Sequence, residues 1–137
     1  MIRIYRDSDY EQVKEVLELC DNFNPEIDTR ESLRKKLELS PNSILVAEED
    51  KRVVGTQYII IDGWNSFLFR LAVHPNYRHH GIGTALQEEA ERRLKSLGIK
   101  RVSFLVGEHK VEELKKMYEP RGYKPMSITH RVFHKDL

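Results

Sequence analysis

The sequence RHHGIGT, which begins at Arg78, combines residue types that bind phosphate groups in proteins. Gly81 and Gly83 have no side chain, so their backbone N–H groups can approach a ligand closely. A helical pattern follows directly, and the first turn of a helix leaves its own N–H groups unpaired and carries partial positive charge. Arg78, His79 and His80 add side-chain donors. The segment therefore predicts a site for phosphate or pyrophosphate.

Known glycine-rich loops differ from this one at defined positions. A Walker loop has lysine directly after its last glycine, where this chain has Thr84. A dinucleotide-binding fingerprint needs glycine or alanine three residues after Gly83, where this chain has Leu86, and normally opens a doubly wound fold. A helix N-terminus that uses glycine only for tight packing remains open on these residues alone.

The residues before the loop predict two helices and a set of antiparallel strands. Helical spacing of apolar residues indicates a first helix near residues 8–21 and a second with Leu33 and Leu37 on its apolar face, capped by Asp28 or Thr29. The expected strands are a short one at Ile2–Ile4, a hairpin of Ser43–Glu48 with Arg52–Ile61, and a third strand at Asn65–Val73.

The residues after the loop predict one crossover and a terminal hairpin. The helix from Ile82 has an apolar face and ends near Gly98, a residue typical of a helix C-terminus. A strand at Arg101–Val106 should then run parallel to Asn65–Val73. The remaining elements expected are a helix through Val111 and Tyr118, stopped by Pro120 and Gly122, and a hairpin of Tyr123–Ser127 with Thr129–His134.

The predicted order is β-α-α-β-β-β-α-β-α-β-β, which indicates an α/β or α+β fold with a central mixed, mostly antiparallel sheet flanked by helices. With 137 residues, we expect a single domain over 1–137. A net charge of +1 argues against nucleic acid as partner, and no apolar run suits a membrane span. The N-terminus lacks the pattern of a signal peptide and Cys20 is the one cysteine, so a cytoplasmic location is the default expectation.

Three segments resemble the GNAT superfamily (Gcn5-related N-acetyltransferases). The pattern R-x-x-G-x-G-T after L-A-V-H-P is similar to the acyl-CoA loop of that family. RIYRDSDYEQVKEV at the start is similar to its first strand and helix, and KKMYEPRGYKPM to its late helix with a tyrosine. The predicted order of elements also matches the family fold.

The resemblance implies an N-acetyltransferase that moves an acetyl group from acetyl-CoA, its co-substrate, directly to a primary amine of a small molecule, peptide or protein. It implies that backbone groups of Leu71, Ala72 and Val73 pair with the pantetheine arm and that Tyr118 protonates the departing thiolate. It further implies that the pyrophosphate is held by Arg78, His79, His80, Gly81, Ile82, Gly83 and Thr84. On pattern alone, a core role for Tyr118, in which its ring anchors the helix to the sheet, is favoured.

Two departures leave alternatives open. Val111 stands where many members have an asparagine that touches the pantetheine, and the strand Asn65–Val73 has no carboxylate where several relatives keep a general base; its one charge is Arg70. His74, Asp62, Glu108 or a water chain could serve as base. A CoA-binding regulatory module without turnover is therefore a second hypothesis.

Other features predict less. His130 and His134 are four residues apart, but two ligands do not make a closed site, so we expect no metal. Trp64 could line an acceptor pocket or cover the sheet. Lys95, Lys100 and Arg101 could meet the 3′-phosphate of CoA, although a lysine there also complements the helix dipole. The C-terminal hairpin could pair between chains in a homodimer or complete its own sheet.

Overall fold

The computed structural model describes residues 1–126 and 131–137. The chain divides into two compact units, Met1–Leu105 and Val106–Leu137. The expectation of a single functional domain remains a prediction. The elements of the first unit are β1 (Ile2–Ile4), α1 (Tyr10–Leu19), α2 (Arg30–Leu39), β2 (Ile44–Glu49), β3 (Arg52–Ile61), β4 (Ser66–Val73), α3 (Ile82–Ser96) and β5 (Ser103–Phe104). The second unit contains α4 (Val111–Tyr118).

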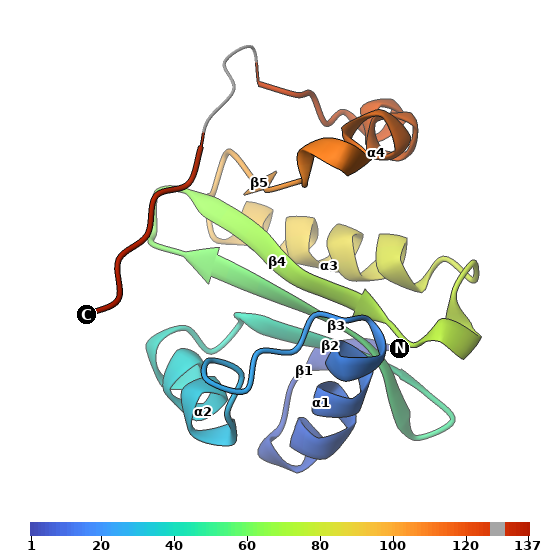
Figure 1. Cartoon of the computed structure of the whole chain (residues 1–137), viewed down its shortest axis with the longest axis vertical. Helices are drawn as coiled ribbons and strands as arrows, with labels where there is room; N and C mark the ends of the chain where they lie inside the picture. The colour runs from blue at the N-terminus through green and yellow to red at the C-terminus, as the bar shows by residue number, and fades with distance from the viewer. Residues whose placement is uncertain (127–130) are drawn as a thin grey trace. The chain divides into compact units, whose positions relative to one another are not determined.

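The first unit is built on a twisted sheet whose strands, in the part of the chain that the structure describes, follow the order β1-β2-β3-β4-β5. Neighbouring strands are antiparallel except β4 and β5, which are parallel. Helices α1 and α2 cover one face of the sheet and α3 covers the other (Figure 1). The predicted mixed α/β class and the parallel crossover through α3 are therefore confirmed.

Each face of the sheet has its own apolar core because side chains of a strand alternate between the two faces. Val16 and Leu17 of α1 and Leu33 of α2 pack with Tyr58 on one face. Leu86 and Ala90 of α3 belong to the core on the opposite face, together with residues such as Leu45 and Ile59. The helix spacing that predicted α1, α2 and α3 thus corresponds to buried side chains.

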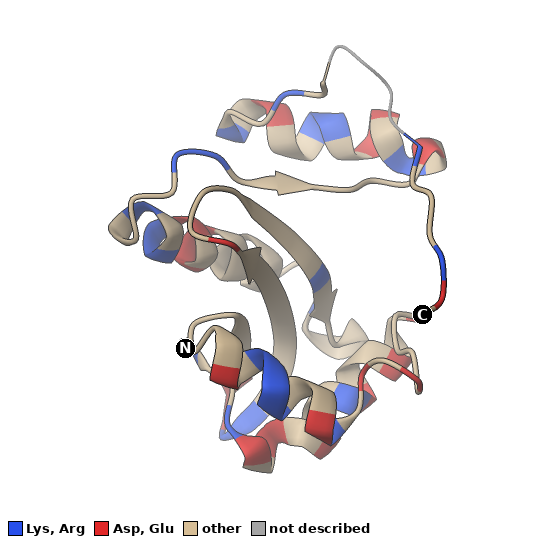
Figure 2. Ribbon diagram, turned by 90° about the vertical axis from the view of Figure 1, so that its left-hand side faces the viewer, with Lys and Arg blue, Asp and Glu red and all other residues tan. Residues whose placement is uncertain are grey.

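The ends of the helices also follow the sequence. Thr29, rather than Asp28, is the N-cap of α2, and its hydroxyl oxygen accepts a hydrogen bond from the backbone N–H of Ser32 at 3.1 Å. Gly98 follows α3 in the left-handed conformation, with φ of 79°. Lysine, arginine, aspartate and glutamate are interspersed over α1 and α2, so these helices present no face of a single charge (Figure 2).

The predicted strands at the end of the chain need correction. The strand expected at Arg101–Val106 is limited to Ser103 and Phe104. Neither 123–126 nor 131–134 forms a strand, and 127–130 of the expected hairpin lie outside the described residues. Pro125 explains part of this difference because proline has no N–H to donate to a strand ladder.

Candidate active site

The loop before α3 has the backbone conformation of an anion-binding site. His79 and Gly81 are both left-handed, with φ of 65° and 79°, and Gly81 is the N-cap of α3. The first bond of the helix runs from the N–H of Ala85 to the carbonyl of Gly81 at 2.9 Å. The N–H groups of the residues between them have no acceptor within the helix. The loop can therefore present several backbone donors and the positive end of α3 to one anion.

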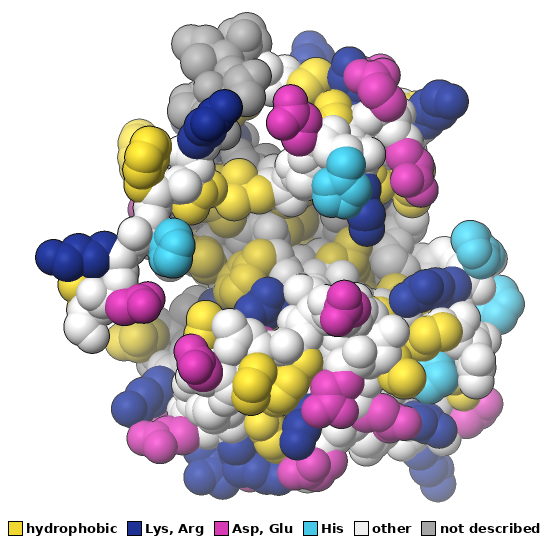
Figure 3. Space-filling view, viewed as in Figure 1, with side chains coloured by type: hydrophobic (Ala, Val, Ile, Leu, Met, Phe, Trp, Pro, Cys, Tyr) yellow, Lys and Arg dark blue, Asp and Glu magenta, His cyan; other side chains and the backbone are white. Residues whose placement is uncertain are grey.

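The side chains of this loop fall into two groups, one buried residue and a set of exposed residues that we call the rim. Ile82 is buried in the core beneath α3, whereas Arg78, His79, His80 and Thr84 are exposed. Histidine side chains gather at the edge of the molecule where the chain passes from β4 to α3 (Figure 3). The core thus fixes the start of the helix, and the side chains of the rim lie at the surface.

Glycine allows α3 to begin close to the end of β4. A Cβ added to Gly83 would lie 3.7 Å from Cγ2 of Val73. A Cβ added to Gly55 of β3 would lie 3.2 Å from the carbonyl oxygen of Ala72 and 3.2 Å from side-chain carbons of both Ile82 and Leu86. A larger residue at this position would require these neighbours to move by a few tenths of an ångström, so glycine suits the close packing of α3 on β3.

The last residue of β4 directs its backbone away from β3. The N–H of His74 bonds to the carbonyl of Val54 at 2.8 Å, and residues of an antiparallel pair alternate in direction. By this alternation, the backbone N–H and carbonyl of Ala72 point toward β3. Those of Val73 point to the opposite side of the strand. The carbonyl of Val73 accepts from the thiol of Cys20 at 3.3 Å and from Nε of Arg78 at 3.2 Å. Arg78 thus joins the end of β4 to the loop.

Strand β4 contains a bulge that the sequence did not reveal. Thr56 pairs with Ala72 and Tyr58 with Phe69, so two residues of β4, Arg70 and Leu71, lie opposite one residue of β3. The intervening residue of β3 is Gln57, whose buried side-chain amide donates to the carbonyl of Phe69 at 2.7 Å. Such a bulge bends the strand and changes the direction of its backbone groups.

Arg70 in the bulge is left-handed, with φ of 54°, and its side chain reaches the linker between α1 and α2. Nε lies 3.3 Å from Oδ1 of Asp28, and Nη1 lies 3.2 Å from Oδ1 of Asn22. The Asp28 side chain is only 4% exposed. The sequence showed that Arg70 is the one charged residue of its strand. It did not show the partners of Arg70, because these are 42 and 48 residues away along the chain.

A second cation lies on the same face of the sheet. Lys36 of α2 donates to the carbonyl of Ile59 at 2.6 Å, and its ammonium group is 5.1 Å from the centre of the Phe69 ring. Burial lowers the pKa of Lys36 to about 8. The half-buried amine therefore loses its proton more readily than an exposed lysine.

Tyr118, the predicted acid, is the last residue of α4 in the second unit and is half-buried. Its ring packs edge to face with Tyr123, with ring centres 5.6 Å apart, and the guanidinium of Arg121 lies 5.8 Å from each ring centre. The N–H of Tyr123 bonds to the carbonyl of Tyr118 at 3.2 Å. The end of α4 is therefore a compact aromatic turn.

Two of the candidate bases, His74 and Asp62, have structural tasks in this chain. His74 is buried and its Nδ1 accepts from the N–H of Asn76 at 3.2 Å. Asp62 accepts from the N–H groups of Asn65 and Trp64, at 2.7 and 2.8 Å, and these bonds lower its pKa. Glu108 is exposed in the second unit.

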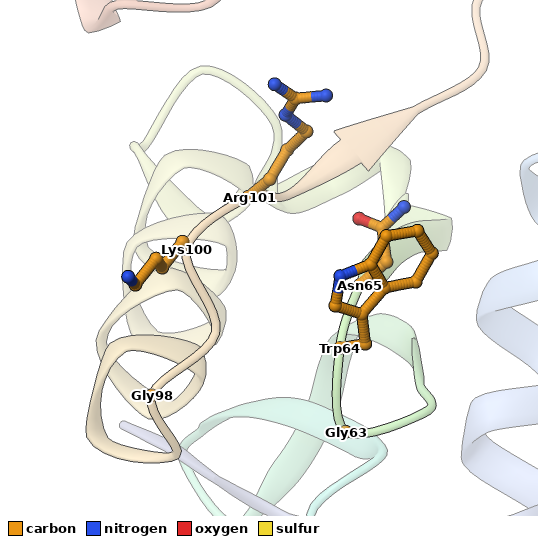
Figure 4. A pocket seen from close by; sticks show the side chains of 6 residues that line it. All are labelled: Gly63, Trp64, Asn65, Gly98, Lys100 and Arg101. Atoms are coloured by element: carbon orange, nitrogen blue, oxygen red, sulfur yellow. The ribbon is translucent and has the colours of Figure 1, made fainter.

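Trp64 is 83% exposed and lines an open pocket of about 580 Å³ at the turn before β4 (Figure 4). The other residues of the pocket are Gly63, Asn65, Gly98, Lys100 and Arg101. The loop of residues 78–84 follows the opposite end of β4, roughly 25 Å away by the rise of an eight-residue strand. Trp64, Lys100 and Arg101 are therefore remote from that loop.

Among the described residues, no group of three or more His, Cys, Asp or Glu side chains is placed to hold a metal ion, and His130 is outside them. In the same part of the chain, none of the helices has the length and apolar character that crossing a membrane requires.

Comparison with known proteins agrees with this geometry. The profile of the Acetyltransferase (GNAT) family matches residues 10–123. An acetyltransferase of Photorhabdus laumondii is 36% identical over 137 residues, which cover 96% of this chain and 94% of the relative. An acetyltransferase of Sodalis glossinidius is 34% identical over 124 residues, covering 90% and 86%.

Solved structures show the same fold at lower identity. The PaiA N-acetyltransferase of Thermoplasma acidophilum, solved with coenzyme A, has a TM-score of 0.72 at 24% identity and covers 88% of this chain and 87% of its own. Glucosamine-6-phosphate N-acetyltransferase of Arabidopsis thaliana has a TM-score of 0.75 at 20% identity, covering 98% of both chains. From the loop, the sheet and these relatives together, the chain belongs to the GNAT family of acetyltransferases.

Proposed function

We propose that this chain is an acetyl-CoA-dependent N-acetyltransferase that transfers the acetyl group directly from the thioester to a primary amine. The observation that carries the proposal is the loop from Arg78 to Thr84, in which two left-handed residues and the start of α3 present backbone N–H groups that have no acceptor within the helix. These groups suit the pyrophosphate of CoA. The relative from Thermoplasma acidophilum, which was solved with coenzyme A, supports the choice of ligand.

The end of β4 suits the pantetheine arm. Val73 directs its backbone groups away from β3, so a ligand that lies along β4 can pair with them. Ala72 is buried and paired with β3, and it would contribute packing rather than hydrogen bonds. Since the pyrophosphate would lie at the loop, the arm would run back along Val73 toward Leu71. The thioester would then lie near the bulge at Arg70 and Leu71.

The reaction forms a C–N bond and breaks the C–S bond. An alkyl amine is mostly protonated at neutral pH, so it must first lose a proton and only then attacks the thioester carbon. The departing thiolate takes up one proton, for which we propose Tyr118 as donor, and the proton that the nitrogen releases once the C–N bond has formed restores the phenol. The acceptor amine remains open among small molecules, peptides and proteins, and the occupants proposed for the site are acetyl-CoA and this amine, without metal or nucleic acid.

The proposal is tested by isothermal titration with CoA, followed by a thiol-release assay with acetyl-CoA over a panel of amines. We expect binding in the micromolar to millimolar range and release of CoA that depends on one class of amine. Absence of CoA binding at millimolar ligand would refute the proposal.

The second candidate, a CoA-binding module without turnover, is favoured by Val111 at the position of the family asparagine and by the lack of a carboxylate in β4. Binding of CoA without thiol release on any amine of the panel would select this candidate. The same experiment therefore decides between the two.

A further inference from the structure

Arg70 connects two parts of the first unit, the bulge of β4 and the linker between α1 and α2. It lies in the bulge of β4, directly before Leu71, and its side chain contacts the linker between α1 and α2. This linker passes over the sheet on the face that α1 and α2 cover (Figure 1). A change in the linker can therefore reach the bulge through one side chain.

The linker is fastened at both of its ends by the same guanidinium. Asn22 lies three residues after Leu19, the last residue of α1, and Asp28 lies directly before the cap of α2. Each accepts one hydrogen bond from Arg70. Only a planar guanidinium offers separate N–H groups in fixed directions to two such acceptors. A lysine has three N–H donors, but they lie on one nitrogen and lack the planar spacing of the guanidinium.

Asp28 also organises the linker itself. Its Oδ2 accepts from the N–H of Asn24 at 2.8 Å, and its own N–H bonds to the carbonyl of Asn24 at 2.7 Å. Its carbonyl accepts from the hydroxyl of Tyr10 at 2.9 Å. A carboxylate that is 4% exposed needs a positive partner, and in the part of the chain that the structure describes its salt bridge is to Arg70.

The backbone of Arg70 gives a second reason to assign it a role. A residue other than glycine rarely adopts φ of 54°, because its Cβ crowds the backbone. Glycine would adopt this conformation without strain but could not reach the linker. The strained residue and the contact to the linker thus occur together, as is common at functional positions.

We infer that Arg70 is a positioning residue for acetyl transfer, which holds the linker of residues 20–29 against the bulge of β4 so that the acceptor amine meets the thioester in a fixed geometry. The part of this inference that concerns acetyl transfer rests on the proposed function, whereas the part that concerns the linker does not. Arg70 itself takes no part in bond formation. Its effect should therefore appear in the use of the amine and not in the binding of acetyl-CoA.

Three variants distinguish the effect of the left-handed backbone at residue 70 from the effect of the side-chain contact with the linker. Arg70→Gly keeps the left-handed backbone and removes the side chain, Arg70→Lys keeps the charge, and Asp28→Asn removes the charge of the partner. Arg52→Gln is the matched control, because it removes another arginine–carboxylate contact, 2.9 Å from Glu15, on the surface.

The first measurement is amide hydrogen exchange of the free protein. We expect Arg70→Gly and Asp28→Asn to speed exchange at Asn24 and Asp28 by tenfold or more, with no change in β2, while Arg52→Gln leaves the linker as in the wild type. Unchanged exchange at these amides in both variants would overturn the inference. If Arg70→Gly does not fold, Arg70→Lys and Asp28→Asn provide the same comparison.

The second measurement uses the panel amine that the wild type acetylates fastest. Loss of the contact should lower kcat/KM for the amine by tenfold or more and leave KM for acetyl-CoA within twofold, and Arg70→Lys should recover part of the loss. Equal effects on both substrates, or wild-type kinetics in Arg70→Gly, would overturn the inference. If the wild type turns over no amine, the proposed function and the positioning role fail together, whereas the exchange experiment still decides whether the contact holds the linker.

Discussion

Replacement of Gly81 by aspartate or asparagine separates charge from shape in the loop before α3. Gly81 has φ of 79° and ψ of 5°, and a Cβ built on it meets no heavy atom within 4 Å. Neither side chain would therefore clash. A residue other than glycine in this conformation costs about 1–2 kcal/mol of folding free energy, with asparagine and aspartate among the better tolerated. Both variants carry this same cost in folding free energy. The difference between their affinities for CoA therefore measures the effect of the negative charge.

The expected effect on binding follows from Coulomb's law. Two unit charges 4 Å apart repel by about 1 kcal/mol in bulk water and by about 4 kcal/mol at the effective dielectric constant of a protein surface. With about 1.4 kcal/mol for each tenfold change, Gly81→Asp should weaken CoA binding relative to Gly81→Asn by between about fivefold and several hundredfold. Gly81→Asn should stay within about threefold of the wild type on the same scale.

Isothermal titration of the three proteins with CoA measures this difference, and pantetheine, which lacks the pyrophosphate, serves as control ligand. Equal weakening by asparagine and aspartate would mean that the backbone and not the charge matters. Wild-type affinity in Gly81→Asp, or an equal loss for pantetheine, would refute a pyrophosphate site at this loop.

Three further predictions test other parts of the molecule. Tyr118→Phe should leave the Kd of CoA within about twofold and lower kcat in the thiol-release assay by about 100-fold or more; unchanged kcat would remove Tyr118 from the acid role. Asp9→Asn leaves the guanidinium of Arg3, 2.7 Å away, without its buried partner and should cost about 3 kcal/mol of unfolding free energy at pH 7 in urea titration. Burial alone would raise the pKa of Asp9, but its bonds to Arg3 and Arg6 lower it, so this contribution is present above about pH 4, the ordinary value, and is lost as the pH falls through the lowered one. If the difference in unfolding free energy between the wild type and Asp9→Asn did not become smaller in acid, the stabilising role of the Asp9 carboxylate would be contradicted. Gly55→Val should destabilise the fold by about 1–3 kcal/mol because its side chain displaces α3, and CoA titration should show weaker binding; wild-type values for both would disprove the close packing.

The sequence was most informative where short-range rules decide the structure. The spacing of apolar residues predicted α1, α2 and α3, and the hydroxyl of Thr29 was one of two caps expected for α2. Residues four apart on a helix share a face whatever the rest of the chain does. The left-handed glycine before α3 was consistent with the phosphate-binding motif for the same local reason.

Features that depend on distant residues could not be predicted in this way. The bulge at Arg70 is a property of register between β3 and β4, and its contact with Asp28 needs the linker to fold over the sheet. The expected terminal hairpin had β-forming residues, but a strand needs a partner as well as a suitable composition. Strand propensity at 131–134 was therefore not sufficient.

The hydrogen bonds at the carbonyl of Val73 affect how a ligand would be admitted. In the free protein this oxygen is already bonded to Arg78 and Cys20. A ligand amide that takes this place exchanges one bond for another of similar strength, so the enthalpy gained there is small. The exchange instead frees Nε of Arg78, whose Nη2 also lies 3.4 Å from Sγ of Cys20, so that this nitrogen can turn toward the phosphates. Binding of the pantetheine arm would therefore displace Arg78 from the carbonyl of Val73, and binding of the phosphates by Arg78 would follow.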